Sequence, residues 1–139
     1  MNREIKFRGK DRENWHYGDL VQEIRHNDNK LFDGTMTHIR NFEYKNGDYI
    51  GDSFPVNSET IGQYTGLHDK NGKEIYEGDI VRIVVNNNIE KICKVEFKNE
   101  IFGVMFSKNK DLTAFPHFCN TTFEVIGNIY DNPELLGGE

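Results

Sequence analysis

The residues with the clearest potential for chemistry lie between Asp69 and Glu74. Asp69, Asn71 and Glu74 surround Gly72 with a spacing that partly resembles a calcium-binding loop. An EF-hand loop also needs a further oxygen ligand before the glycine and an acidic residue well after it, and neither is present. We therefore expect a turn, in which Asp69 accepts hydrogen bonds from backbone N–H groups and Asn71-Gly72 reverses the chain.

A second turn is predicted a few residues later. Gly78 permits a bend, Asp79 is expected to tie the loop, and a β-branched strand begins at Ile80. The carboxylates of Glu74, Glu77 and Asp79 also cluster here. Turn formation is the favoured explanation, with a basic partner and acid–base catalysis as alternatives. The predicted structural signature is Asp69, Asn71, Gly72, Glu74, Tyr76, Gly78 and Asp79.

No complete metal site or catalytic group is evident in the sequence. His117-x-Cys119 would place both side chains on one face of a strand, and Cys93 could join them, but the second ligand pair usual for zinc is missing. Two buried, inert thiols are the favoured alternative. His68 is next to Asp69, but neighbours along a strand point to opposite faces, which does not suit a catalytic triad. We therefore predict no catalytic residue, no metal ligand and no cofactor.

Two groups of residues are candidates for binding a partner. The basic stretch 80–110 contains Arg82, Lys94 and Lys98, whose cations could meet phosphates while bases stack on nearby aromatic rings. The alternative is that the phenylalanines fill a core and the lysines keep an exposed sheet soluble. Trp15 and Tyr17 form a second aromatic pair, and large aromatic side chains serve both as interface anchors and as core fillers. The aromatic residues of the basic stretch are Phe97, Phe102 and Phe106. Phe102 and Phe106 are the candidates for stacking, and Phe97 and Phe106 are the ones expected in the core under the alternative.

Period-two alternation indicates strands across much of the chain. Asn46-Gly47 favours a tight hairpin turn, as Asn71-Gly72 does. Helical signal is confined to the end, where Asn132 could cap a turn or two that begins at Pro133. The pattern predicts a mostly β fold with little helix. The candidate strands contain Ile5 and Phe7, Trp15 and Tyr17, 79–85, Cys93 to Phe97, 101–106 and 123–130.

Composition limits the function classes further. The chain has 139 residues, with 17 basic and 23 acidic side chains and a formal net charge of -6, whereas general phosphate-backbone binders are usually basic. No apolar run approaches the length of a membrane span, so no membrane partner is expected. The polar start does not resemble a signal peptide, and two cysteines make no disulfide framework. We expect a cytoplasmic protein.

Three segments resemble the YopX family of phage and prophage proteins: Arg3 to Lys10, Ile61 to Val81, and Glu124 to Leu136. They follow the family's order and span nearly the whole chain. The resemblance implies one YopX-like domain that includes a small SH3-like barrel or roll with additional strands. Its expected parts are an N-terminal β segment at 1–57, a barrel-forming core at 58–130 and a C-terminal tail at 131–139.

The resemblance also implies a phage-derived accessory protein in a bacterial cell, with no enzyme activity. We expect it to act by binding and self-assembly, as a homo-oligomer or with a phage or host protein. A nucleic-acid-binding factor that uses residues 80–110 is the first alternative. A metal-assisted hydrolase is the second.

Overall fold

The computed structural model describes residues 4–25, 34–85, 89–98, 101–106, 112–114 and 121–137. The chain divides into two compact units, Met1–Gln63 and Tyr64–Glu139. The boundary falls within one long strand, β5, so each unit contains part of it.

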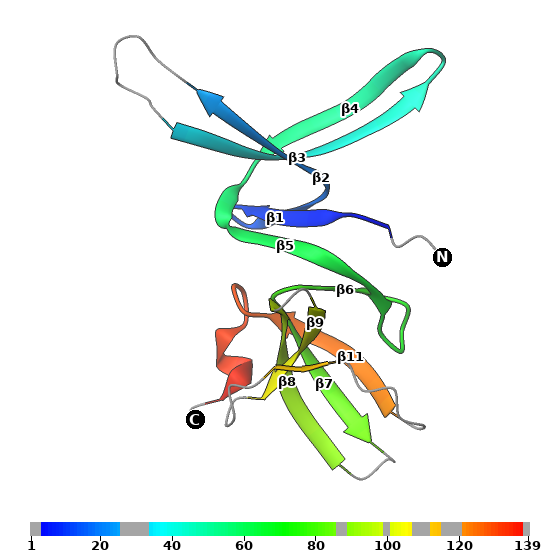
Figure 1. Cartoon of the computed structure of the whole chain (residues 1–139), viewed down its shortest axis with the longest axis vertical. Helices are drawn as coiled ribbons and strands as arrows, with labels where there is room; N and C mark the ends of the chain where they lie inside the picture. The colour runs from blue at the N-terminus through cyan, green and yellow to red at the C-terminus, as the bar shows by residue number, and fades with distance from the viewer. Residues whose placement is uncertain are drawn as a thin grey trace. The chain divides into compact units, whose positions relative to one another are not determined.

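The first unit is an antiparallel sheet with the strand order β4-β3-β2-β1-β5 (Figure 1). Its strands are β1 (Phe7–Asp11), β2 (Asn14–Arg25), β3 (Gly34–Lys45), β4 (Asp48–Pro55) and β5 (Asn57–His68). Buried Ile39 contributes to its core. Gly9 is needed in β1, because a Cβ atom there would lie 2.7 Å from the Val56 side chain and 2.8 Å from that of Ile61.

The strands β3 and β4 form a long two-stranded hairpin at the edge of this sheet (Figure 1). Asn46 and Gly47 connect them with φ angles of 53° and 87°, the left-handed values that a type I′ turn requires. The predicted Asn46-Gly47 hairpin turn is therefore confirmed. Gly51 allows the two strands to approach closely, because a Cβ atom there would overlap the carbonyl oxygen of Asn41.

The second unit contains a five-stranded antiparallel sheet with the order β10-β9-β8-β7-β11. A short strand, β6, pairs with the end of β5. The elements of this unit are β6 (Glu74–Tyr76), β7 (Asp79–Val85), β8 (Ile89–Lys98), β9 (Ile101–Phe106), β10 (Leu112–Ala114), β11 (Thr121–Asn128) and the 3-10 helix η1 (Pro133–Leu136). The strands β7 and β9 have the predicted bounds, since β-branched and apolar residues fill both.

Alternating side chains of β7 and β8 build the core of the second unit. Val81, Ile83, Cys93 and Val95 are buried together with Ile75, and Phe123 and Val125 of β11 lie against them. Phe97 continues the apolar alternation but is 43% exposed, so its expected place in the core was wrong. It is the penultimate residue of β8, where it pairs with Phe102 of β9.

The mostly β fold with little helix is confirmed, and it consists of two antiparallel sheets. Of the expected barrel or roll, a closed barrel is not formed in the part of the chain that the structure describes, because β10 and β11 stand at opposite edges of their sheet with no pairing between them. Alternation along a strand reports which residues face a core, but not which edge strands meet. At the C-terminus Pro133 begins η1 as predicted, but the Asn132 side chain accepts a hydrogen bond from the backbone N–H of Asn128 and does not cap η1.

Candidate functional site

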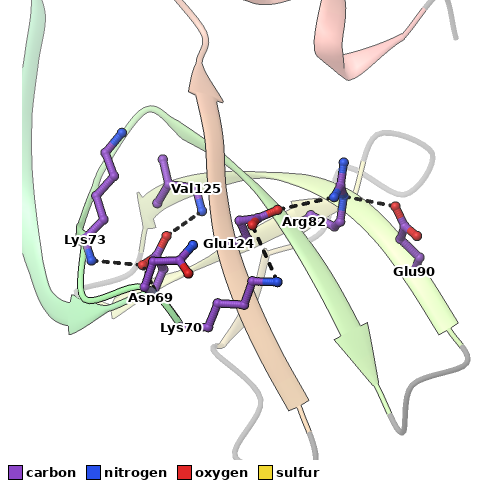
Figure 2. Close-up of polar contacts among 8 residues, drawn as sticks. Asp69, Lys70, Lys73, Arg82, Glu90, Glu124 and Val125 are labelled. Carbon is purple, nitrogen blue, oxygen red and sulfur yellow. Dashed lines mark hydrogen bonds and ion pairs between the residues drawn. The ribbon is translucent and has the colours of Figure 1, made fainter.

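The loop from Asp69 to Lys73 is organised by the Asp69 side chain (Figure 2). Its Oδ1 atom accepts hydrogen bonds from the backbone N–H groups of Asn71 (2.8 Å) and Lys73 (2.9 Å). Its Oδ2 atom accepts a third from Val125 of β11 at 3.0 Å. The backbone N–H of Asp69 donates to the Lys73 carbonyl at 2.8 Å, and Gly72, at φ 84°, completes the reversal. One carboxylate thus shapes the loop and attaches it to the sheet.

These hydrogen bonds determine the charge state of the carboxylate, which is only 7% exposed. Burial raises the pKa of Asp69, but hydrogen bonds from the backbone of Val125, Lys73 and Asn71, together with the Lys73 charge, outweigh it. The net pKa is lowered from 3.8, so the carboxylate is ionised at neutral pH. An anion already saturated by backbone donors serves the loop and is a poor catalytic base.

The second signature turn is held in the same way by Asp79. Its Oδ2 atom accepts a hydrogen bond from the backbone N–H of Tyr76 at 2.7 Å, and the side chain is buried. Gly78 has φ 93°, and its backbone N–H donates to the Val95 carbonyl at 2.9 Å. The Tyr76 hydroxyl donates to Glu74 Oε1 at 3.0 Å. The signature residues Gly78 and Asp79 therefore serve to turn the backbone, as Asp69 and Gly72 do in the preceding loop.

Arg82 lies on β7 within a chain of ion pairs (Figure 2). Its Nε atom is 3.0 Å from Glu90 of β8, and its Nη1 atom is 3.2 Å from Oε1 of Glu124 on β11. The other oxygen of Glu124 lies 3.5 Å from Nζ of Lys70. This series of ion pairs crosses β8, β7 and β11 and ends at Lys70 in the loop from Asp69 to Lys73, which we call the signature loop. Arg82 therefore meets two carboxylates of its own sheet.

The remaining residues of the basic stretch are only partly described. Nζ of Lys94 lies 2.6 Å from Glu96 on the same strand. The side chains of Lys98, Phe102 and Phe106 lie outside the described residues. Because Arg82 and Lys94 both face carboxylates, phosphate contacts would first have to displace those ion pairs.

Of the three residues considered as zinc ligands, the structure describes only Cys93. Cys93 is free and fully buried, and burial raises the pKa of its thiol to about 11, although Lys91 lowers it. His117 and Cys119 lie outside the described residues. Within the ranges given above, no group of three His, Cys, Asp or Glu side chains could hold a metal ion.

His68 meets a tyrosine within the second unit. The Tyr64 hydroxyl lies 3.3 Å from Nδ1 of His68, and the Tyr64 side chain is buried with its ring 5.4 Å from that of Tyr76. Register pairs Tyr64 with Tyr76 and His68 with Glu74. The register and the contact between the Tyr64 and Tyr76 rings join β5 to β6.

Trp15 and Tyr17, the predicted aromatic pair, have different surroundings in the first unit. The Arg8 guanidinium lies 4.6 Å from the centroid of the Trp15 ring, and Lys10 Nζ lies 5.9 Å from it. Arg8 is buried, so Trp15 covers a charged side chain within the sheet. Tyr17 is 42% exposed and is the more accessible of the pair.

Sequence reasoning missed an exposed aromatic surface on the β3–β4 hairpin. Register places Phe42, Tyr44 and Tyr49 on one face, with 42%, 68% and 75% of their surfaces exposed. The rings of Tyr44 and Tyr49 are 5.2 Å apart, and the Arg40 guanidinium lies 5.1 Å from the Phe42 ring. The signal was available, because aromatic and charged residues alternate just before Asn46-Gly47. We name Arg40, Phe42, Tyr44 and Tyr49 the aromatic face.

The geometry defines a mostly β protein with two antiparallel sheets, a signature loop held by buried carboxylates and an exposed aromatic hairpin. No helix among the described residues is long and apolar enough to cross a membrane. A sequence profile described as "YopX protein" matches residues 6–137. The chain therefore belongs to the YopX family, which confirms the predicted resemblance.

Two kinds of relative support the family and its fold. The SPbeta prophage-derived uncharacterized protein YopX of Bacillus subtilis (strain 168) is 41% identical over 71 residues, which is 48% of this chain. The match spans about half the length (53%) of that curated relative. The crystal structure of protein yopX from Bacillus subtilis has a TM-score of 0.55 at 24% identity, covering 96% of this chain and 97% of that one. Protein EF1440 from Enterococcus faecalis has a TM-score of 0.53 at 24% identity, covering 98% and 100%.

Proposed function

We propose that this protein is a prophage-derived accessory protein that acts in the bacterial cytoplasm by binding and self-assembly, without catalysis. The prophage origin is carried over from the Bacillus subtilis relative, which is named as derived from the SPbeta prophage. The absence of catalysis is supported by the use of the signature carboxylates, since Asp69 and Asp79 hold backbone turns.

The aromatic face is the observation that carries self-assembly. Phe42, Tyr44 and Tyr49 expose large rings side by side on the β3–β4 hairpin, and exposed aromatic clusters of this kind are frequent at protein interfaces. We assign a second copy of the chain as the occupant. The aromatic face includes the cation of Arg40, already placed over the Phe42 ring, and no carboxylate of β3 or β4 in its described length. When two such faces meet, each Arg40 cation keeps the Phe42 ring of its own chain as its partner.

Light scattering coupled to size exclusion tests this assignment on the full chain. We expect a mass above that of the 16.2 kDa monomer and a large decrease for Tyr44→Ser/Tyr49→Ser. Tyr130→Ser, which changes an exposed tyrosine of the second unit, is the matched control and should keep the wild-type mass. A monomeric wild-type protein would contradict self-assembly, and an unchanged mass in the double variant would exclude the aromatic face.

We further propose that the second unit is an open SH3-like roll. Supporting this, the last strand, β11, returns beside the first strand of the β7-β8-β9-β10 meander. The Gly78-Asp79 turn that leads into β7 also fits this arrangement. A crystal structure that shows the path of β10 relative to β11 would test it, since a roll of this type requires β10 to curve toward the edge occupied by β11.

A further inference from the structure

The strand β4 is the edge strand of its sheet, and among the described residues it pairs only with β3. Every residue from Asp48 to Ser53 is exposed. An exposed strand of this length can accept another strand, because its outward N–H and C=O groups are available for ladder hydrogen bonds. Pro55 limits the usable length at one end, since proline has no N–H to donate.

The side chains of this edge differ between its two faces. Tyr49 lies on the aromatic face, whereas Asp48, Ile50 and Asp52 lie on the opposite one. Ile50 is 58% exposed between the two carboxylates. Neither carboxylate forms an ion pair within the described chain. The edge therefore presents the pattern acidic, apolar, acidic at alternate positions.

We propose that β4 accepts an extended segment of a basic protein partner, which adds to the sheet as a further antiparallel or parallel strand. Cross-strand neighbours share a face, so the partner segment needs the complementary pattern: a basic residue, an apolar residue and a basic residue at alternate positions. The outer two would face Asp48 and Asp52, and the apolar one would cover Ile50. The partner's intervening residues would lie on the Tyr49 side.

The charges favour such a partner over a second copy of β4. Residues 41–52 contain three carboxylates (Glu43, Asp48 and Asp52) and one ammonium group (Lys45), which gives a local net charge of -2. In a two-fold antiparallel pairing of two β4 strands centred on Ile50, Asp48 of each copy would face Asp52 of the other. Like charges directly opposite each other destabilise a strand pair, whereas opposite charges stabilise it.

This proposal rests on the proposed function, because it states what kind of partner the protein binds. It does not require self-assembly. The probe is a short peptide, Ser-Lys-Thr-Val-Thr-Lys-Ser, acetylated only at its N-terminus and carrying a fluorescent dye at its C-terminus. The full chain is titrated into this peptide, and the fluorescence anisotropy of the dye reports binding. We expect saturable binding of one peptide per chain. Asp48→Lys/Asp52→Lys should weaken it by about tenfold or more, because two attractive cross-strand pairs become repulsive.

Three controls separate strand addition from general electrostatic attraction. Glu43→Lys makes the same charge change as Asp48→Lys alone, on the same face and one strand further in, and should weaken binding much less than that single substitution. A peptide with both lysines replaced by glutamate should bind the double variant better than the wild type, which would also show that the variant is folded. N-methylation of one alternate set of peptide amides should abolish binding, while methylation of the other set should not.

Several results would overturn the proposal. The first is that the peptide does not bind, and the second is that a scrambled peptide with adjacent lysines binds equally well. The third is that methylation of either set of amides weakens binding equally. The fourth is that the glutamate peptide does not bind the double variant better than the wild type. If the light-scattering mass still exceeds the monomer in any of these cases, self-assembly stands and only the edge-strand partner is excluded. In that case Asp48 and Asp52 protect the edge from aggregation and do not select a partner.

Discussion

The Asp69 carboxylate and the backbone N–H of Val125 are joined by a hydrogen bond of 3.0 Å, although the two residues are 56 positions apart. The other oxygen of the same carboxylate binds two N–H groups of its own loop. A second link is the hydrogen bond from the Lys70 N–H to the Phe123 carbonyl at 2.9 Å. The signature loop is thus attached to β11, the strand that pairs with β7 (Figure 2).

Replacing the Asp69 carboxylate should destabilise the second unit. In Asp69→Asn one oxygen becomes an NH₂ group, which cannot accept from a backbone N–H and faces that donor instead. We expect a loss of about 2 kcal/mol in the free energy of unfolding, because charge-assisted hydrogen bonds are lost in a buried site. Urea denaturation measures the loss, and amide exchange should show reduced protection at Lys73 and Val125.

The exposed carboxylate of Asp131 provides the control for this change. Asp131→Asn lies in the same unit. The exposed Asp131 carboxylate accepts a hydrogen bond from Asn128 Nδ2 at 3.1 Å, which an amide oxygen can also accept, so this change should alter the free energy of unfolding by less than about 0.5 kcal/mol. Equal losses in the two variants would mean that burial and the three backbone donors give Asp69 no special role.

The contribution of Asp69 should depend on pH with a definite sign. Its pKa is lowered in the folded state, from 3.8. A lowered pKa means that the ionised form is the stabilising one, so the contribution is complete above the unfolded pKa and is lost as the pH falls through the folded pKa. The difference in unfolding free energy between wild type and Asp69→Asn should therefore be constant near neutral pH and should shrink below about pH 4. A difference that grows on acidification would contradict the assigned direction.

Removing two carboxylates should reveal any latent affinity of β7 for phosphates. Glu90 and Glu124 both pair with Arg82, and Glu124 also pairs with Lys70. We expect wild-type protein to bind single-stranded DNA weakly, and Glu90→Gln/Glu124→Gln to bind it more tightly, with an affinity that falls as salt rises. Glu134→Gln, at an exposed position in η1, is the control. Tight, salt-dependent DNA binding by the wild type would favour the nucleic-acid alternative instead.

The Cys93 thiol should be unreactive in the native protein. It is fully buried, and its pKa is raised to about 11, so little thiolate is present at neutral pH. In a Cys119→Ser background, the disulfide reagent DTNB should label Cys93 only at the rate of unfolding, and denaturant should make labelling fast. Rapid labelling of folded protein would show that the core around Val81 and Val95 opens readily.

Local sequence patterns correctly predicted those features of the fold that depend on a single strand or turn. The bounds of β7 and β9, the Asn46-Gly47 turn and the start of η1 all follow from neighbouring residues. The strands on either side of the Asn46-Gly47 turn were missed because residues 40–53 are exposed on both faces, so no buried side marks them as part of a sheet. The alternation of Phe42 and Tyr44 with Glu43 was present, but it does not say which side, if either, meets a core.

Taken alone, the amino-acid order established the family, the mostly β class and the turn chemistry around Asp69 and Asp79, because these depend on residue types within a few positions. Only the tertiary structure decided that Val125 donates to Asp69, that Glu90 and Glu124 face Arg82, and that β10 and β11 remain apart. Pairing between distant strands depends on which edges meet in space, and each such contact joins residues that no local spacing relates.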